Sequence, residues 1–286
     1  MPDITADAII DAHTHILPPL APDRAAREPV FEAFLASGAR GAGARELLAA
    51  MDDSGVGRAV TAAFPWRHQD LCRESNEHLL ACVSRHPHRL TGLATVNPAE
   101  PGATEEAVRC IGAGLAGVGE LHPELQGFEL DGSGMSELCA ALEELGAILL
   151  LHVNEPVGHF YPGKENIGLA EVYRLVLRFP ELRIILPHWG GGLFLYELMP
   201  EVAEAMRNVY YDSAASPFLY AAGIHATAES CGVGRKLLFG TDFPLLPYRR
   251  CLENAAAGGL SEHAIAAFMA GNAARLIGLG TPGCTG

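Results

Sequence analysis

Basic residues are scarce in this sequence, and they form no run. There are 20 Lys and Arg residues against 34 Asp and Glu residues, which gives a net charge of −14. Such a charge balance repels phosphate backbones, so we do not expect a nucleic acid as a partner.

Long apolar runs and paired cysteines are also missing. No uninterrupted apolar run approaches the ~20 residues that span a bilayer, and no basic segment precedes an apolar one at the N-terminus. The seven cysteines form no Cys-x-x-Cys pair, and such a spread is typical of reduced thiols in a cytosolic protein. We therefore expect a cytoplasmic protein without a membrane partner.

The sequence does contain enough apolar residues for one sizeable core. Of its 286 residues, 49% are hydrophobic, and a chain of this length commonly forms a single domain when it folds as a barrel. We expect that domain to span residues 1–280, and we expect residues 281–286 to form a disordered tail.

Short apolar runs alternate with helical patterns along the chain. Buried parallel strands appear as near-continuous apolar runs because helices cover both faces of their sheet. In one helical pattern, Leu138, Ala141, Leu142 and Leu145 recur at i, i+3, i+4 and i+7, and Gly146 follows where a glycine can end a helix. Eight such units predict an α/β protein with a (β/α)8 barrel, or TIM barrel. The runs are 8–15, 58–65, 90–97, 115–121, 147–153, 183–188, 208–213 and 236–241.

Histidines and an aspartate occupy the ends of several predicted strands. His13 and His15 belong to the first strand, and their i, i+2 spacing points both imidazoles to the same face. His152, His188 and Asp242 end or follow the fifth, sixth and eighth runs. Polar residues at the carboxyl ends of barrel strands converge on one pocket, and imidazoles with a carboxylate suit a first-row divalent metal. The sequence therefore predicts a metal site from these five residues, although any one of them alone also fits a structural role.

Glu120 ends the fourth run, where a buried carboxylate is costly unless it is paired or bound to a metal. Because strand residues alternate between faces, we expect Val118 and Glu120 to share one side of the sheet. Glu120 could bridge two metal ions, or it could form an ion pair with a basic side chain. The first arrangement gives a two-metal site, and the second gives a one-metal site.

The connections 16–43 and 154–167 are long, and we expect both to cover the carboxyl-terminal face of the barrel and to bind substrate. Lys164 could neutralise a substrate carboxylate, but it is equally well explained as a surface lysine. Four residues near this face are candidate substrate contacts: His122, His159, Lys164 and Trp189.

Five motifs, as a set, resemble the amidohydrolase superfamily and, within it, the amidohydrolase-related group. The resemblance covers nearly the whole chain and implies a divalent metal, most often zinc, with one or two ions per chain. The motifs are Asp11-Ala12-His13-Thr14-His15, Leu151-His152-Val153-Asn154-Glu155-Pro156, Pro187-His188-Trp189-Gly190-Gly191, Phe239-Gly240-Thr241-Asp242-Phe243-Pro244 and Gly271-Asn272-Ala273-Ala274-Arg275-Leu276. The residues that the resemblance implies as ligands are His13, His15, Glu120, His152, His188 and Asp242.

The resemblance leaves two metal arrangements open. In two-metal members of the superfamily, a strand-four carboxylate bridges the ions, and Glu120 matches that position. In one-metal members, the residue that matches His152 is a ligand and the residue that matches His188 is catalytic. Many decarboxylases of this group are one-metal enzymes, so Glu120 favours the hydrolases.

We expect hydrolysis of an amide, lactone or other ester bond in a small molecule. A bound divalent cation can lower the pKa of water to about 7, which supplies hydroxide at neutral pH. Asp242 would accept a proton from the attacking water and deliver it to the leaving group. If His188 is not a ligand, it would polarise the scissile carbonyl.

The main alternative is a lyase, either a non-oxidative decarboxylase or a hydratase, that acts on a small aromatic or unsaturated carboxylic acid. A metal-free lactonase and a catalytically silent metal-binding protein are further alternatives. The intact Asp242 argues against a silent protein, because structure alone would not require an acid there. The substrate and the oligomeric state are not determined at this point, and a homo-oligomer is left open.

Overall fold

The structure is a computed structural model that describes residues 9–19, 28–38 and 41–279. The predicted tail 281–286 lies outside the described residues. Among the helices in the described part of the chain, none is both long and apolar enough to cross a membrane.

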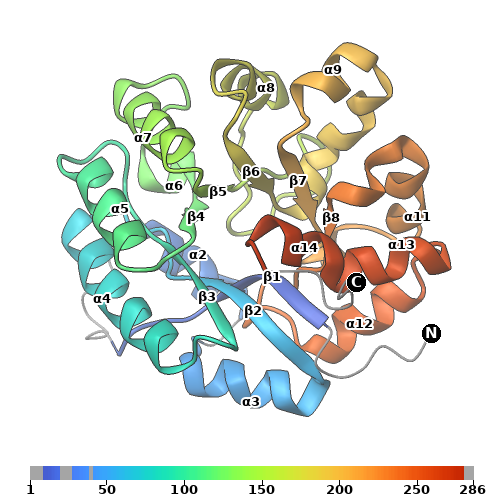
Figure 1. The fold of residues 1–286 in the computed structure, drawn as a ribbon, viewed down its shortest axis with the longest axis horizontal. Helices are drawn as coiled ribbons and strands as arrows, with labels where there is room; N and C mark the ends of the chain where they lie inside the picture. Colours follow the sequence, from blue (N-terminus) through green and yellow to red (C-terminus); the bar gives the residue numbers. More distant parts are fainter. Residues whose placement is uncertain (1–8, 20–27, 39–40, 280–286) are drawn as a thin grey trace, which may run out of the picture.

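Eight strands form one parallel sheet in which each strand pairs with the next along the chain. The sheet closes on itself, because Thr14 of the first strand bridges Phe243 and the amide of Ala12 donates to the carbonyl of Phe239 at 2.7 Å. Helices surround the strands (Figure 1), and the predicted (β/α)8 barrel of the α/β class is confirmed. The strands are β1 (Ile9–His15), β2 (Val56–Ala62), β3 (Leu90–Ala94), β4 (Gly117–Leu121), β5 (Ile148–Leu151), β6 (Arg183–Leu186), β7 (Val209–Asp212) and β8 (Leu237–Leu238).

Most connections between the strands contain helices, and several of these helices are short. The α-helices are α2 (Pro29–Ala36), α3 (Ala44–Ser54), α4 (Gln69–Arg85), α5 (Ala103–Gly112), α6 (Pro123–Gln126), α7 (Ser133–Glu144), α8 (Leu169–Arg178), α9 (Pro200–Ala205), α10 (Ser216–Leu219), α11 (Ile224–Ala228), α12 (Tyr248–Ala256), α13 (Glu262–Ala266) and α14 (Asn272–Leu276). Tighter or wider helical segments are η2 (His188–Leu198), η3 (Glu229–Val233), η4 (Gly234–Lys236) and η5 (Ala267–Gly271).

The periodicity that predicted α7 is right except at its last position. Leu138 and Leu142 are fully buried against the sheet, as residues four apart on one helix face should be. Leu145 lies beyond the helix and is 46% exposed, so the buried face does not continue to the i+7 position. Gly146 then takes a left-handed conformation with φ +58°, which is the expected glycine after a helix end.

The observed strands are shorter than several of the predicted runs, and this difference positions the polar residues. β5 ends at Leu151, β6 ends at Leu186 and β8 ends at Leu238. His152 and Asp242 therefore lie on the loops that leave β5 and β8, and His188 opens η2, so none of the three lies in a strand. Backbone outside a regular ladder can take unusual conformations, and both His188 (φ 54°) and Asp242 (φ 64°) are left-handed.

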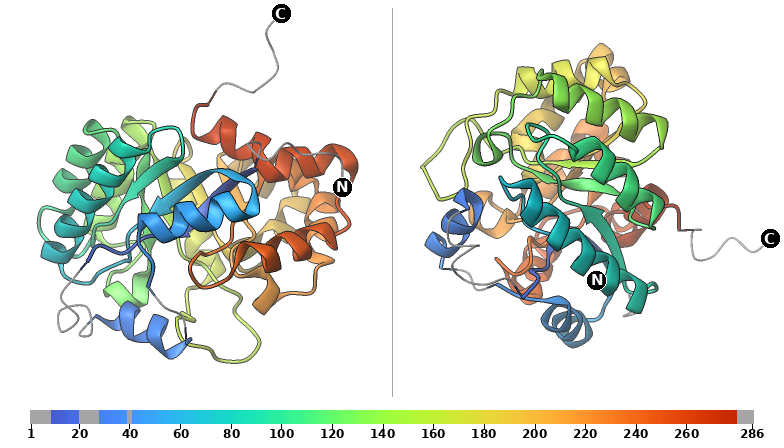
Figure 2. Two further views of the ribbon diagram at one scale, coloured as in Figure 1. Left: turned by 90° about the horizontal axis from the view of Figure 1, so that it is seen from below. Right: turned by 90° about the vertical axis from the view of Figure 1, so that its left-hand side faces the viewer.

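Both long connections lie at the carboxyl-terminal end of the barrel, as predicted, and both contribute to the cavity there. Residues 154–167 contain no helix or strand. The connection 16–43 contains α2, a helix that the sequence analysis did not predict. Figure 2 (left) shows α2 and the connection after β5 projecting from the same end of the molecule.

The segment after β6 makes an unusual turn that directs His188 towards the cavity. Five successive residues, from His188 to Gly192, have φ between 54° and 93°. Glycine takes this conformation at little cost, whereas other residues take it only when their surroundings hold them there. A Cβ atom on Gly191 would lie 2.4 Å from the carbonyl oxygen of Asn154, whereas a Cβ on Gly192 would meet nothing within 4 Å.

We predict that Gly191→Ala destabilises the protein more than Gly192→Ala does. Both variants carry the left-handed penalty of roughly 1–2 kcal/mol, and only Gly191→Ala adds an overlap with backbone, which we expect to cost roughly 1–3 kcal/mol more. Urea unfolding of the two variants measures the difference in the free energy of unfolding. Equal losses in the free energy of unfolding would show that the backbone of Asn154 moves aside without measurable cost.

Candidate metal centre

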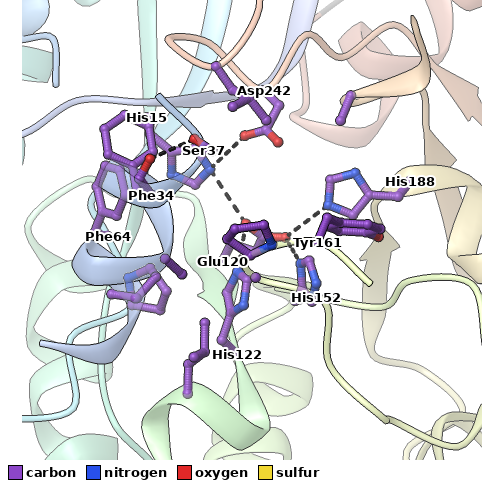
Figure 3. Close-up of a pocket in the computed structure, with 18 of the residues that line it drawn as sticks. His15, Phe34, Ser37, Phe64, Glu120, His122, His152, Tyr161, His188 and Asp242 are labelled. Atoms are coloured by element: carbon purple, nitrogen blue, oxygen red, sulfur yellow. Dashed lines mark hydrogen bonds and ion pairs between the residues drawn. The ribbon is translucent and has the colours of Figure 1, made fainter. Parts of the chain in front are cut away.

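A cavity of about 470 Å³ opens at the carboxyl-terminal end of the barrel. Its floor is polar and its walls are mainly apolar, and Figure 3 shows the imidazoles and carboxylates of the floor turned towards one another. The lining residues that form the floor are His15, Glu120, His122, His152, His188 and Asp242.

The first set of possible ligands joins β1 to the loop after β8. The Nε2 atoms of His13 and His15 lie 3.1 Å apart. Oδ1 of Asp242 lies 3.8 Å from the first of these nitrogens and 3.5 Å from the second. At a tetrahedral metal, two nitrogens each about 2.0–2.1 Å from the ion lie about 3.3 Å apart. The spacing of the two imidazoles therefore suits one shared ion.

The second set consists of Glu120, His152 and His188. Oε1 of Glu120 lies 2.8 Å from Nδ1 of His152 and 3.7 Å from Nε2 of His188. In each of the two sets, the ligand atoms lie within 4.8 Å of one another. The six residues that the sequence analysis named as ligands are thus brought together, three in each set.

Glu120 lies between the two sets. Its other oxygen, Oε2, is 3.4 Å from Nε2 of His13 and 3.5 Å from Nε2 of His15, so each oxygen of one carboxylate faces a different set. The prediction that Val118 and Glu120 share one side of the sheet, made from strand alternation, is wrong, however. Val118 packs with Leu149 between the sheet and the helices, whereas Glu120 lines the cavity. The pairing of β4 with β5 shifts register between Val118 and Leu121, which breaks the alternation.

Asp212, at the end of β7, orients the imidazole of His13 and holds the backbone of His188. Its Oδ2 accepts a hydrogen bond from Nδ1 of His13 at 2.9 Å, and its Oδ1 accepts from the backbone amides of His188 at 3.3 Å and Ala214 at 2.9 Å. Sequence analysis missed Asp212, although the residue stands in the seventh apolar run, at the same kind of strand end as the other polar residues.

Further hydrogen bonds fix the remaining rings. Nδ1 of His188 donates to the carbonyl of Ala214 at 3.0 Å, and Nε2 of His152 donates to Oδ1 of Asn154 at 3.2 Å. The side chain of Asn154 is itself held, because it donates to the carbonyl of Glu165 and accepts from the amide of Glu165. Partners of this kind set the tautomer and direction of metal-ligating histidines.

These bonds leave the inner ring nitrogens as acceptors that face carboxylates. The outer nitrogens of His13 and His188 donate outwards, so in these neutral rings the lone pairs point to the cavity, and a neutral His152 that donates to Asn154 does the same. Nδ1 of His152 then lies 2.8 Å from a carboxylate oxygen of Glu120. Two acceptors at that distance repel each other unless a proton or a cation lies between them. The donor set therefore fits divalent metal ions.

The pKa values indicate that, without a metal, protons on the histidines would lie between the ring nitrogens and the carboxylates. Burial disfavours the charged imidazole of His13, but the charges of Asp212 and Glu120 outweigh burial and raise its pKa well above the ordinary value. Burial also opposes the ionised form of Asp242, yet its hydrogen bond with His15 and the nearby imidazoles lower its pKa to about 2. Protons on the histidines must leave before a metal binds, so metal affinity should rise with pH.

Of the four predicted substrate contacts, two line the cavity and two do not. His122 lies in the floor and His159 lies at the exposed mouth. Trp189 is fully buried behind the cavity, where its indole nitrogen donates to Oγ of Ser216 at 3.0 Å. Lys164 also lies outside the lining, and its ammonium group is 3.1 Å from Oε1 of Glu155. Neither position suits the predicted contact with substrate.

Together, the fold and the donor set define a class of protein, a TIM barrel with side chains that could hold a metal ion gathered at the carboxyl ends of its strands. Comparison with known families is more specific, because the model of the amidohydrolase family matches residues 10–279. The chain belongs to this family, and the resemblance seen in its motifs is confirmed. It is therefore an enzyme of the amidohydrolase superfamily.

Several solved structures share the fold over nearly their whole length. A 5-carboxyvanillate decarboxylase from Sphingomonas paucimobilis is 18% identical, with 95% of this chain and 99% of that chain covered and a TM-score of 0.73. A dihydroxybenzoic acid decarboxylase from Polaromonas sp. JS666, with bound manganese, is 17% identical, with 95% of this chain and 97% of that chain covered and a TM-score of 0.71. A putative amidohydrolase from Staphylococcus aureus is 21% identical, with 95% of this chain and 99% of that chain covered and a TM-score of 0.70.

We predict that Asp212→Asn weakens metal binding about 10- to 100-fold, because the partner that orients His13 is changed from an acceptor to a mixed donor and acceptor. Titration against a chromogenic chelator measures the affinity. Asp52→Asn is the control, since this exposed carboxylate pairs with Arg89 on the surface. Equal affinities in the two variants would remove Asp212 from the metal centre.

We also predict that the metal-free protein loses stability as the pH rises above neutrality. Burial opposes a charge on His122, but Glu120 and Glu165 outweigh it and raise the pKa of His122 from 6.5 to about 10. A raised folded-state pKa contributes stability that is complete below the unfolded value and is lost as the pH rises through the folded value. Urea unfolding in EDTA between about pH 6 and pH 10 measures this loss.

His122→Gln should make that pH dependence shallower, because one of the titrating groups is gone. His88→Gln, a change at an exposed histidine, should leave it unchanged. A His122→Gln protein with the wild-type slope would show that another group is responsible.

Proposed function

We propose that this protein is a metal-dependent lyase that removes the carboxylate of a small aromatic or unsaturated carboxylic acid without oxidation. One observation carries the proposal: metal-ligating side chains form the floor of a cavity whose walls are apolar. A carboxylate suits such a floor, and a flat uncharged body suits such walls. Because similar structures include decarboxylases that act on 5-carboxyvanillate and on dihydroxybenzoic acid, we place this reaction ahead of the hydrolysis that the sequence favoured.

The reaction needs few groups. The bond between the substrate carbon and its carboxylate breaks, carbon dioxide leaves, and a proton takes its place on that carbon. A divalent cation held by the floor would neutralise the charge of the carboxylate. His188 is our candidate for the proton donor, because its Nε2 faces the cavity and its Nδ1 is held by the carbonyl of Ala214. Burial opposes its charged form, but Glu120 outweighs burial and raises the pKa of His188.

Hydrolysis of an amide, lactone or other ester remains the second candidate, and a specific observation favours it. Two complete donor sets face each other, and each oxygen of Glu120 faces one of them. Two-metal sites of this kind serve to activate water, and Asp242 would take the proton from the attacking water. His152 and His188 would then be ligands of the second ion.

The metal is not assigned to one element. Imidazole and carboxylate donors suit zinc, as the sequence analysis expected, and they also suit manganese. The similar decarboxylase from Polaromonas carries manganese, so both ions belong in the assay.

Metal content and reaction products together test the proposal. Protein loaded with zinc or with manganese is given hydroxybenzoic acids, unsaturated acids, lactones and amides, and carbon dioxide release and ester cleavage are followed. Carbon dioxide from an acid supports the lyase. Turnover of lactones or amides alone refutes it and restores hydrolysis.

The number of ions should depend on Glu120. A fall from two ions in the wild type to one in Glu120→Gln supports a bridging carboxylate. One ion in both proteins excludes bridging and leaves His188 free to act as an acid. Inductively coupled plasma mass spectrometry of both proteins gives the count.

We predict that His188→Gln lowers kcat by about 10²- to 10⁴-fold, the usual contribution of a general acid or base. If His188 is the proton donor, one ion remains bound with wild-type affinity. His88→Gln is the control, because His88 is an exposed imidazole that does not line the cavity. Similar kcat values for the two variants would remove His188 from the chemistry.

A further inference from the structure

The segment 155–164, which we call the β5 loop, is closed at its base by the residues on either side of it. The side chain of Asn154 donates to the carbonyl of Glu165 at 2.9 Å and accepts from the amide of Glu165 at 2.8 Å. The carboxylate of Glu165 accepts from the amide of Leu125 at 2.9 Å, which attaches this base to the connection after β4. A loop with joined ends that is packed by its own side chains is a compact unit, so its internal contacts decide what it presents to the cavity.

The ammonium group of Lys164 holds the β5 loop together from inside. It donates to the carboxylate of Glu155 at 3.1 Å and to the carbonyls of Val157 at 2.6 Å and His159 at 3.3 Å. The side chains of Lys164 and Glu155 are only 11% and 16% exposed, so water and salt screen their attraction less than that of a surface ion pair. Lys164 thus joins the end of the loop to its beginning and to its middle.

Tyr161 is held by the same ion pair. Its hydroxyl donates to Oε2 of Glu155 at 3.2 Å, and the ammonium group of Lys164 lies 5.4 Å from the centroid of its ring. Burial, together with the negative charge of Glu155, raises the pKa of Tyr161, so the phenol stays protonated as the donor. Because its hydroxyl is engaged in this way, Tyr161 offers its ring to a ligand.

The cavity that Tyr161 lines also has an aromatic wall. Figure 3 shows Tyr161 on the side of His152 and His188. At another edge of the floor, Phe34 of α2 meets Phe64 edge to face, with ring centroids 4.8 Å apart. A ligand that binds the floor through a polar group would place its body between this wall and Tyr161, where a flat ring packs well.

From these contacts we infer that Tyr161 determines specificity by packing its ring against the body of a ligand bound at the floor, and that Lys164 and Glu155 position that ring. Neither Lys164 nor Glu155 is among the described residues that line the cavity, so both act on the ligand through Tyr161. Lys164 thus has a role other than the direct contact with a carboxylate that its sequence position suggested. The inference rests on the proposed function only in that the floor holds a metal ion, and it applies to a lyase and to a hydrolase alike.

Two hydroxamates separate the ring of a ligand from its metal-binding group. Acetohydroxamate and benzohydroxamate bind divalent metal ions through the same two oxygen atoms, and only benzohydroxamate carries a ring. Isothermal titration of the zinc-loaded protein gives the ratio of the two affinities, which measures what the ring contributes. The wild type should bind benzohydroxamate at least about tenfold more tightly. Equal affinities, or no binding of either hydroxamate, overturn the inference.

Tyr161→Leu should lower this ratio about three- to tenfold, because the aromatic contact is lost. The affinity for acetohydroxamate should stay within about twofold of the wild-type value, which also reports an intact floor. Tyr196→Leu is the matched control, since Tyr196 is an exposed tyrosine that does not line the cavity. An unchanged ratio in Tyr161→Leu refutes the contact.

Lys164→Met should lower the ratio about threefold, because the loop loses the ammonium group that holds it and the ring of Tyr161 is no longer fixed. The affinity for acetohydroxamate should again be unchanged. Arg174→Met is the control, because this exposed guanidinium pairs with Glu171 on the surface. A parallel loss of affinity for both hydroxamates shows that Lys164 contacts the metal-binding group directly, and it refutes a positioning role.

The double variant decides whether Lys164 acts through Tyr161. In the Tyr161→Leu background, Lys164→Met should change the ratio by less than about twofold, because the ring that Lys164 positions is already gone. A full additional loss shows that the two residues act independently and overturns the inference. Carbon dioxide release decides the proposed reaction, whereas the hydroxamate ratios decide the roles of Tyr161 and Lys164, so the two proposals fail separately.

Discussion

The carboxylate of Glu120 lies between 2.8 and 3.7 Å from the ring nitrogens of five histidines, in a part of the barrel where its side chain is only 5% exposed. A buried anion needs positive charge close by, and neutral imidazoles with inward lone pairs do not supply it. Either protons or metal ions must complete this cluster. That requirement explains why so many ring nitrogens are held from behind, since each ring can then present one defined nitrogen to the shared centre.

Each of three rings in the cluster has its own hydrogen-bonding partner, which fixes the direction of that ring. Asp212 holds His13, the carbonyl of Ala214 holds His188, and Asn154 holds His152. Asp212 ends a regular strand, but Ala214 and Asn154 lie on irregular loops, and irregular backbone can place a side chain where a regular strand cannot. The left-handed turn after β6 is the clearest case, because it turns His188 into the cavity while Trp189 goes to the core behind it.

Above the cluster, the cavity changes character within a short distance. Charge and hydrogen-bonding capacity are concentrated in the floor, and the walls that rise from it are aromatic and aliphatic. If the proposed function is right, such a site would orient a small acid by its carboxylate and select the rest of the molecule by its shape. The wall from α2 is attached through Glu28 and Phe31 to the loop that follows β2, and so to the barrel that carries the candidate ligands.

Much of this protein was determined by patterns that are local in the sequence. Eight apolar runs were enough for the barrel, because buried parallel strands need continuous apolar segments whatever their neighbours are. The His-x-His pair of β1 and the polar residues after later runs were enough to predict that candidate ligands gather in one pocket, because barrel strands all end on the same face. Other features depended on contacts between distant residues. Asp212 became recognisable only beside His13, 199 positions away, and Glu120 reached the cavity through a register shift that strand alternation cannot foresee. Trp189 and Lys164 stood in plausible motifs, but the indole nitrogen of Trp189 donates to Ser216 and the ammonium group of Lys164 donates to Glu155. Only the folded chain brings these partners within reach.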